Sequence, residues 1–181
     1  MRVISGEARG VTLKTPEGIK TRPTADRVKE AMFSIIQFDL PGARVLDLFA
    51  GTGQLGIEAI SRGAAFADFV DASDSACSLV RENLKRTKFT LRGHVTRSDY
   101  KAFLDRCTNR YNIILLDPPY ADIFLENALK LITEIDILQS NGIIVTERPI
   151  DKALLCDFPG YVRSKDYKYG NTLVTIFRRE S

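Results

Sequence analysis

The sequence feature that most constrains the fold of this chain is a glycine-rich stretch that directly follows a short apolar run. Residues 44–48 predict a buried strand, because apolar and branched side chains fill most of it. Three glycines follow with the spacing G-x-G-x-x-G, at Gly51, Gly53 and Gly56, and a helical segment then runs to about Arg62. A strand, a glycine turn and a helix in this order are typical of α/β folds that bind a nucleotide-like cofactor at the turn.

The rest of the chain alternates strand-like and helix-like segments. Apolar runs predict further strands at residues 66–71, 93–96, 111–116 and 143–147. Helices are predicted between them, over residues 75–87 and from about 123 to 132. Residues 161–169 and 172–178 alternate as strands around the two-residue hairpin turn Gly170-Asn171. We therefore predict an α/β, Rossmann-like fold with a mostly parallel sheet and a C-terminal antiparallel hairpin.

The first 40 residues form an N-terminal extension to this pattern. Residues 2–13 predict two short strands around a glycine-containing turn, and Thr24 is the predicted N-cap of an amphipathic helix. This helix could bring cations and free backbone donors together near its start, or it could simply cover a sheet edge. At 181 residues we expect a single domain, 1–181, made of the extension 1–40 and a catalytic core 41–181.

Composition excludes several classes of protein. The first residues contain no apolar segment of the signal-peptide kind, and no apolar run approaches 18 residues, so we expect a cytoplasmic protein and no membrane partner. Cys77, Cys107 and Cys156 are widely spaced and His94 is the single histidine, so we expect no metal site. The lone histidine also argues against Ser-His or Cys-His catalysis.

Acidic residues at the predicted strand ends indicate the kind of cofactor. Asp71 ends the second strand, 20 positions after Gly51, where a carboxylate can accept hydrogen bonds from ribose hydroxyls. Asp47 lies four residues before Gly51; it would repel a pyrophosphate and attract a cationic cofactor, which favours S-adenosylmethionine over a dinucleotide. Asp99 follows the third strand and could accept a hydrogen bond from an adenine amine or cap the next helix.

The tetrapeptide Asp117-Pro118-Pro119-Tyr120 ends the predicted strand over residues 111–116. Two prolines remove two backbone donors and stiffen the turn, which leaves the Asp117 carboxylate and the Pro118 carbonyl as acceptors. Such a pair can hold both N–H groups of an aromatic amine, and Tyr120 offers a flat face for a planar base. A strand-terminal turn with a buried tyrosine is the alternative interpretation.

These residues together resemble a family of class I S-adenosylmethionine-dependent methyltransferases. The family is that of the bacterial 16S ribosomal RNA (guanine-N2)-methyltransferases that modify guanine 966 of the small-subunit RNA. The similarity runs nearly end to end and is most specific in residues 21–33 and 117–120, while the glycine loop is generic to methyltransferases. Ser73 and Gln54 depart from the family pattern, since the family usually has an acid at the first position and a small residue at the second.

The resemblance implies a role for each motif residue. The residues that it assigns to the cofactor are Asp47, Phe49, Gly51, Gly53, Asp71, Asp99 and Tyr100. Those that it assigns to the target guanine are Asp117, Pro118, Pro119 and Tyr120. Arg22, Arg27 and Lys29 are the predicted RNA contacts. It implies direct transfer of the sulfonium methyl to the guanine amine, on 16S rRNA or the assembling small subunit. We also expect a monomer without a metal.

Three rival functions fit parts of the same pattern. The acceptor turn would equally serve a methyltransferase for adenine in DNA or for a glutamine side chain in a protein. A nonenzymatic RNA-binding module with a decayed site is a second rival, although intact Asp47, Gly51, Gly53 and Asp117 argue against decay. An NAD-dependent oxidoreductase is the third, and it lacks a recognisable acid/base residue for hydride transfer.

Overall fold

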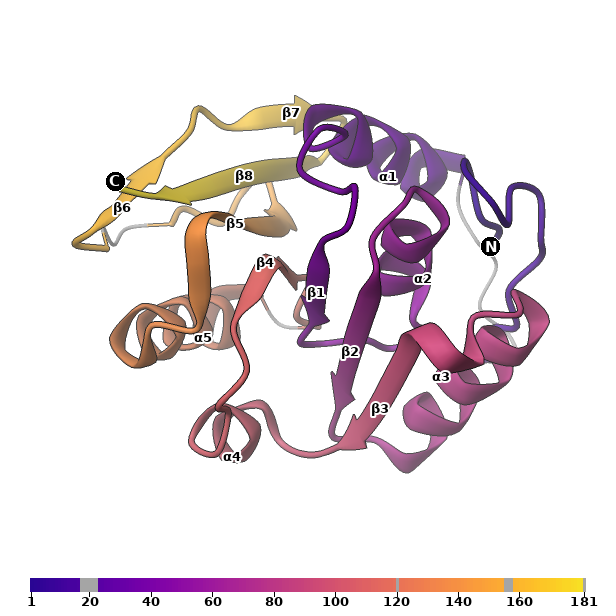
Figure 1. Cartoon of the computed structure of the whole chain (residues 1–181). Helices are drawn as coiled ribbons and strands as arrows, with labels where there is room; N and C mark the ends of the chain where they lie inside the picture. The colour runs from indigo at the N-terminus through magenta and orange to yellow at the C-terminus, as the bar shows by residue number, and fades with distance from the viewer. Residues whose placement is uncertain (17–22, 120, 155–157, 181) are drawn as a thin grey trace.

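The computed structural model describes residues 1–16, 23–119, 121–154 and 158–180. Within them the chain forms one eight-stranded sheet in the order β3-β2-β1-β4-β5-β8-β6, and β7 also pairs with β8 (Figure 1). The strands are β1 (Arg44–Asp47), β2 (Phe66–Asp71), β3 (Gly93–Arg97), β4 (Tyr111–Leu116), β5 (Leu138–Pro149), β6 (Tyr161–Arg163), β7 (Tyr167–Tyr169) and β8 (Thr172–Arg179). Strands β1 to β5 are parallel, and β6, β7 and β8 pair antiparallel. The predicted α/β class and mostly parallel sheet are confirmed.

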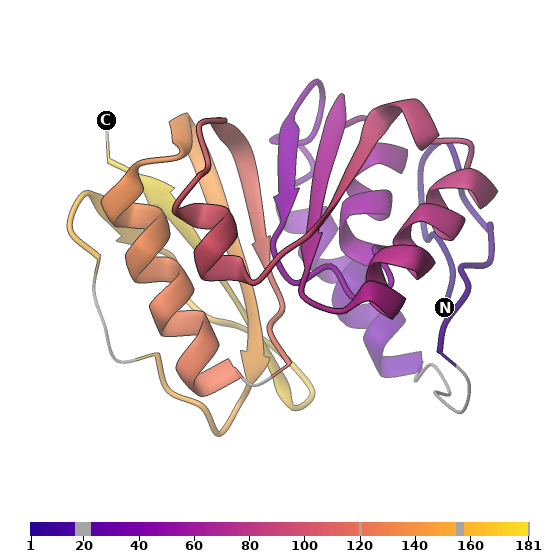
Figure 2. The ribbon, with the colours of Figure 1, turned by 90° about the horizontal axis from the view of Figure 1, so that it is seen from below.

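Helices cover both faces of the sheet. They are α1 (Pro23–Ile35), α2 (Gln54–Ser61), α3 (Asp74–Arg86), α4 (Tyr100–Leu104) and α5 (Ala121–Ile135), with a short 3₁₀ turn at Thr90–Arg92. Figure 2 shows α4 and α5 on one side of the sheet and α1, α2 and α3 on the other. The described part of the chain contains no helix long and apolar enough to cross a membrane.

Side chains of the central strands alternate between two apolar cores. Val45 and Leu115 belong to the core under α1, α2 and α3, whereas their neighbours Leu46 and Leu116 belong to the core under α4 and α5. Successive residues of a strand point to opposite faces, so a strand buried on both faces is apolar throughout. This is why unbroken apolar runs predicted these strands correctly.

The same alternation sets the direction of the acids at the strand ends. Asp47 is two residues beyond Val45, and Asp71 is two residues beyond Phe69, which belongs to the same core as Val45. Glu147 likewise follows Val145 of that core by two residues. The side chains of all three acids therefore leave the sheet on the side of α1, α2 and α3.

The C-terminal hairpin differs in detail from the prediction. The strand expected over residues 161–169 is two short strands, β6 and β7, that both pair with β8. Between them, the Ser164 hydroxyl accepts a hydrogen bond from the Ile176 amide at 3.0 Å. The Asp166 carboxylate binds Arg148 at 2.8 Å and the Thr175 hydroxyl, which draws the chain away from regular pairing. Side-chain bonds of this kind cannot be read from strand periodicity.

The N-terminal segment pairs antiparallel, as predicted, but through an isolated bridge between Arg2 and Thr12 in place of two regular strands, and it is fastened to the core. Its paired backbone includes hydrogen bonds from the Val3 amide to the Val11 carbonyl and from the Leu13 amide to the Met1 carbonyl, each at 3.0 Å. The buried Glu58 carboxylate on α2 accepts from two more of its amides, at Ile4 and Ser5. The segment therefore packs as part of the folded body.

Two predicted boundaries are wrong. Helix α1 begins at Pro23, so Thr24 lies inside the helix and is not its N-cap; proline favours the first helical position, where its missing donor costs nothing. Strand β5 begins at Leu138, five residues before the predicted start at residue 143, and includes Asn141 with a positive φ of 63°. The added residues lie where the register opposite β4 shifts.

Candidate active site

Each of the five parallel strands has an acid at its carboxyl end. Asp47 and Asp71 are the last residues of β1 and β2, Asp99 comes two residues after β3, Asp117 directly follows β4, and Glu147 lies near the end of β5. In open α/β sheets the crevice beyond these ends is where ligands bind. Five carboxylates thus gather at the edge of the sheet where a site is expected.

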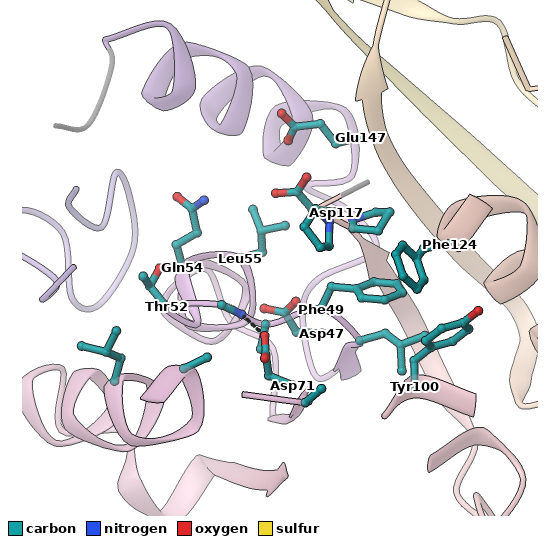
Figure 3. A pocket seen from close by; sticks show the side chains of 18 of the residues that line it. Asp47, Phe49, Thr52, Gln54, Leu55, Asp71, Tyr100, Asp117, Phe124 and Glu147 are labelled. Atoms are coloured by element: carbon teal, nitrogen blue, oxygen red, sulfur yellow. Dashed lines mark hydrogen bonds between the residues drawn. The ribbon is translucent and has the colours of Figure 1, made fainter. Parts of the chain in front are cut away.

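A cavity of about 900 Å³ opens at this edge, and Figure 3 shows the side chains that line it. The volume is within the range of small-molecule sites, about 300–1,000 Å³. Besides the five acids, the lining includes Phe49, Gly51, Thr52, Gln54, Leu55, Tyr100, Pro118, Pro119, Phe124 and Arg148. The Arg148 guanidinium is bonded to Asp166 and Thr175, so it does not neutralise the acids of the cavity.

The glycine loop adopts a backbone that only glycine takes without strain. Gly51 and Gly53 have φ values of +53° and +77°. A Cβ on Gly51 would meet no atom within 4 Å, so the loop leaves open space toward the cavity at this point. A Cβ on Gly56 would lie 2.3 Å from the Phe69 ring, so this glycine lets α2 pack closely on β2. Positive φ angles in the loop and close helix packing at its third glycine are typical of a G-x-G-x-x-G turn.

Asp71 joins the end of β2 to the glycine loop. One carboxylate oxygen accepts a hydrogen bond from the Gly51 amide at 2.9 Å, and the other accepts from the Ser73 amide at 2.8 Å. Each oxygen keeps a further lone pair for a ligand hydroxyl. Ser73 itself caps α3 through its hydroxyl, which accepts from the Ala76 amide.

Asp47 is buried at the end of β1 and accepts a hydrogen bond from the Gly56 amide at 2.9 Å. Burial raises the pKa of its carboxyl to about 7, against the lowering effect of the Gly56 bond, and the charges of Asp117 and Asp71 raise it further. A cation bound in the cavity would favour the ionised form. That Asp47 faces a positively charged cofactor group stays a prediction.

Asp99 and Tyr100 line the cavity beyond β3. The Asp99 carboxylate caps α4 by accepting from the Lys101 amide at 2.9 Å, so the capping interpretation is correct, and a cofactor contact would use its remaining lone pairs. Tyr100 is buried beside Phe49, with ring centroids 5.4 Å apart, and Phe124 packs edge-on to Tyr100 at 5.8 Å. These rings make one wall of the cavity aromatic and largely apolar (Figure 3).

Asp117 and Glu147 lie at the ends of neighbouring strands, and both side chains are partly buried. Burial raises the pKa of Asp117 to about 6. Burial and the charge of Asp117 raise the pKa of Glu147 to about 8. Glu147 was not among the predicted site residues, although its place at the end of an apolar strand is the signal that singled out Asp47, Asp71 and Asp117.

The two predicted RNA contacts that the structure describes differ in exposure. Arg27 is exposed on α1. Lys29 is only 2% exposed, and its ammonium donates to the Arg2 carbonyl at 2.8 Å and lies 3.7 Å from Glu58. Burial lowers the pKa of Lys29, an effect that Glu58 opposes. Lys29 fastens the N-terminal segment, and its burial is at odds with the predicted contact with RNA.

Two predicted site residues, Arg22 and Tyr120, lie outside the described residues. Sequence reasoning also missed the N-terminal wall of the cavity, to which Met1, Thr15 and Pro16 contribute. The Thr52 hydroxyl of the glycine loop donates to the Met1 sulfur at 3.3 Å. No local sequence pattern predicts this wall, because it depends on how the N-terminal extension packs against α2 and α3.

The residues of the cavity fit S-adenosylmethionine. Gly51 leaves open space toward the cavity, Asp71 has further lone pairs for ribose hydroxyls, and the rings of Phe49 and Tyr100 offer aromatic surface for a base. Unpaired carboxylates favour a ligand with a sulfonium and an ammonium over one with a pyrophosphate. Gln54 reaches the same lining, so the departure there adds a polar group at the rim.

The sheet order, glycine loop and acidic strand ends define a class I methyltransferase. A family model described as "Conserved hypothetical protein 95" matches residues 1–178. YlbH of Bacillus subtilis, which carries the name of a candidate rRNA methyltransferase, is 41% identical over 99% of both chains. The chain belongs to the family that this model describes, Conserved hypothetical protein 95.

Two further relatives agree with this assignment. Ribosomal RNA small subunit methyltransferase D of Escherichia coli is 29% identical over the whole of this chain and 91% of its own length. The solved structure of yhhF from Escherichia coli, described as a candidate methyltransferase, superposes with a TM-score of 0.89 at 27% identity, covering 100% of this chain and 98% of that one. Together these relatives support methyl transfer and S-adenosylmethionine as the cofactor, as the sequence predicted.

Proposed function

We propose that this protein transfers a methyl group from S-adenosylmethionine to the exocyclic N2 amine of a guanine in 16S ribosomal RNA. The observation that carries the proposal is the rigid acceptor turn at Asp117 and Pro118, which faces the same cavity as the glycine loop. The names of the relatives, an rRNA methyltransferase candidate and a small subunit methyltransferase, support the choice of RNA. We place the reaction in the cytoplasm and expect a single-domain monomer without a metal.

The chain's own residues position the reactants. Bound S-adenosylmethionine supplies an electrophilic methyl group. Asp47 and Asp71 hold the cofactor end of the cavity, while Asp117 and the Pro118 carbonyl accept the two N–H groups of the guanine amine. This orients the nitrogen lone pair, which is otherwise delocalised into the ring, toward the methyl group. A new N–C bond forms as the S–C bond breaks, and the amine then loses one proton to Asp117 or to water.

The base must leave its stack to enter the cavity. Flipping costs a few kcal/mol in a duplex and less in an RNA loop. We propose that Tyr120, directly after the turn, stacks on the flipped base, and that Pro118 and Pro119 hold the turn rigid. Arg22 and the exposed Arg27 are proposed to contact the RNA backbone. Lys29 is left out of this set because its ammonium is buried against Glu58.

Methylation of a rival amine substrate would give a different methylated product. We would incubate the protein and labelled S-adenosylmethionine with small-subunit particles from a strain that lacks this activity, and digest the RNA to nucleosides. Label in N2-methylguanosine is the expected result. Label in DNA N6-methyladenine or in protein glutamine, tested in parallel fractions, would contradict the RNA assignment while keeping the methyltransferase class. Cofactor binding without transfer to any fraction would favour a nonenzymatic module.

A further inference from the structure

Asp117 and Glu147 form a pair of adjacent acceptors that the protein leaves unpaired. Leu116 of β4 is in register with Thr146 of β5, so Asp117 and Glu147 are the next residues along two neighbouring strands. Such strands lie about 4.8 Å apart. Figure 3 shows the two carboxylates close together at one end of the cavity, away from Asp47 and Asp71. Among the described residues, neither carboxylate has a hydrogen-bond or ion-pair partner.

This lack of partners distinguishes the pair from the other acids of the cavity. Asp47, Asp71 and Asp99 each accept at least one backbone N–H bond. Asp117 and Glu147 are of intermediate exposure and line the cavity, so a ligand that enters it can donate hydrogen bonds to both carboxylates. Asp117 and Glu147 together are complementary to a ligand that carries two adjacent N–H donors on one edge.

Among the bases with an exocyclic amine, guanine has such an edge. Its 2-amine is next to a ring nitrogen, N1, that carries a hydrogen. In adenine and cytosine the ring nitrogen next to the amine is an unprotonated acceptor, which an ionised carboxylate would repel. Reading a flipped base through this edge is how base-flipping enzymes select their target.

We propose that Glu147 selects guanine by accepting the hydrogen bond from N1–H, while Asp117 and the Pro118 carbonyl hold the 2-amine. Glu147 is thereby a specificity-determining residue of the acceptor site. The inference rests on the proposed function, since it assumes a guanine amine as the methyl acceptor. Burial and the charge of Asp117 keep a proton near this pair when the site is empty, because they raise the pKa of Glu147 to about 8. An incoming N1–H donor favours the ionised form and displaces that proton.

The test uses an RNA substrate with guanine or 2-aminopurine at the target position. 2-Aminopurine keeps the 2-amine but has an unprotonated N1 and no oxygen at C6. It therefore removes the donor that Glu147 is proposed to bind together with the 6-oxygen, and the Glu147 variants separate the two losses. The assay is run at pH 8.5, above the pKa of about 8 for Glu147. The wild type is expected to prefer guanine by about 100-fold in kcat/KM, the size expected for one well-placed hydrogen bond at a base.

Two variants of Glu147 test whether the residue acts by accepting the hydrogen bond from N1–H or through its negative charge. Glu147→Ala is expected to reduce the guanine preference at least about tenfold, chiefly by lowering kcat/KM on guanine. Glu147→Gln keeps an amide oxygen that accepts N1–H, so it should retain most of the preference. Glu134→Ala, which removes an exposed acid from α5, is the matched control and should leave the preference unchanged.

The possible results of these assays distinguish a failure of this inference from a failure of the proposed function. Transfer to guanine N2 with an unchanged preference in Glu147→Ala would contradict the role of Glu147 and leave the function standing. A parallel loss of S-adenosylmethionine affinity in Glu147→Ala, measured by calorimetry, would also contradict it, because it would place Glu147 in the cofactor site. No transfer to guanine by the wild type would overturn both proposals. Thermal melting at pH 8.5 checks folding, and loss of the preference in a variant with wild-type melting supports the contact.

Discussion

The two ends of the cavity hold their carboxylates in different ways. At the cofactor end, Asp71 accepts the Gly51 and Ser73 amides, and Asp47 accepts the Gly56 amide. At the acceptor end, Asp117 and Glu147 have no hydrogen-bond partner among the described residues. The fold itself holds the carboxylates of the first end in place, and we propose that the substrate supplies the hydrogen-bond donors at the second end.

This difference follows from what each end must bind. A cofactor site gains from preorganised acceptors, since every bond already made to the backbone lowers the cost of ordering the site. An amine substrate needs acceptors whose lone pairs are free, because a protein donor would compete for them. The comparison predicts that substitutions at the two ends have separable effects on cofactor affinity, stability and methyl transfer.

Removing the Asp71 carboxylate should break the cofactor end. Asp71→Ala leaves the Gly51 and Ser73 amides without their acceptor and removes the bonds proposed for the ribose hydroxyls. We expect S-adenosylmethionine affinity to fall about 100-fold and the free energy of unfolding to fall by about 1–3 kcal/mol. Calorimetric titration and urea unfolding measure the two effects. Asp74→Ala, at an exposed acid in the first turn of α3, is the control; an equal loss there would point to a general effect of charge.

Cofactor affinity should depend on pH through Asp47. The pKa of this carboxyl is raised to about 7, so it is mostly protonated at pH 6 and mostly ionised at pH 8. Ionisation creates the negative charge that attracts a cationic cofactor, and affinity should therefore rise up to about tenfold as pH increases from 6 to 7.5. Asp47→Asn keeps an acceptor for the Gly56 amide and should flatten this dependence. A pH dependence that survives in Asp47→Asn would assign it to another group.

Neutralising Asp117 should stabilise the fold. Because burial raises its pKa to about 6, the folded state holds the proton more tightly than the unfolded chain does. Asp117 therefore lowers stability as pH rises from about 4 through about 6, and the full penalty is present at pH 8. Asp117→Asn should raise the free energy of unfolding by about 1 kcal/mol at pH 8, or about 2–4 °C in Tm, with no gain at pH 4. A loss of stability at pH 8 would mean that the carboxylate has a protein partner.

RNA docking should be separable from both ends of the cavity. Reversing the exposed charge in Arg27→Glu is expected to weaken RNA binding a few-fold and to reduce its salt dependence by about one counterion, with cofactor affinity unchanged. Lys130→Glu, on α5 across the sheet, is the matched control. Equal effects of the two substitutions would indicate a nonspecific response to net charge.

The central sheet and the cofactor end were predictable from sequence because local patterns determine them. The run Ile113–Leu116 is apolar because both faces of this part of β4 are buried, and the bounds of β4, Tyr111 and Leu116, were predicted correctly. The spacing of Gly51, Gly53 and Gly56 reflects backbone angles and a close helix contact that few other residues allow. Asp71 could be placed because a strand end is a fixed position relative to this loop.

Features that depend on contacts between distant segments were not predictable in the same way. Lys29 looked like a surface cation near a helix start, but Glu58 on α2 and the Arg2 carbonyl enclose it. Strand β7 separates from β6 because Asp166 bonds to Arg148 and Thr175, which periodicity does not reveal. Glu147 could have been found, since it ends the predicted strand over residues 143–147 as Asp71 ends the strand over residues 66–71.

Replacing Asp117 by alanine, with two quantities measured on the same preparation, tests the contrast between the two ends most directly. The account predicts that single-turnover methyl transfer to small-subunit RNA falls by about 1,000-fold, the scale of losing a preorganised polar group that acts on the transition state. S-Adenosylmethionine affinity should stay within about threefold of wild type, because the bonds of Asp47 and Asp71 remain. Transfer within tenfold of wild type, or a loss of cofactor affinity as large as the loss of transfer, would contradict the account.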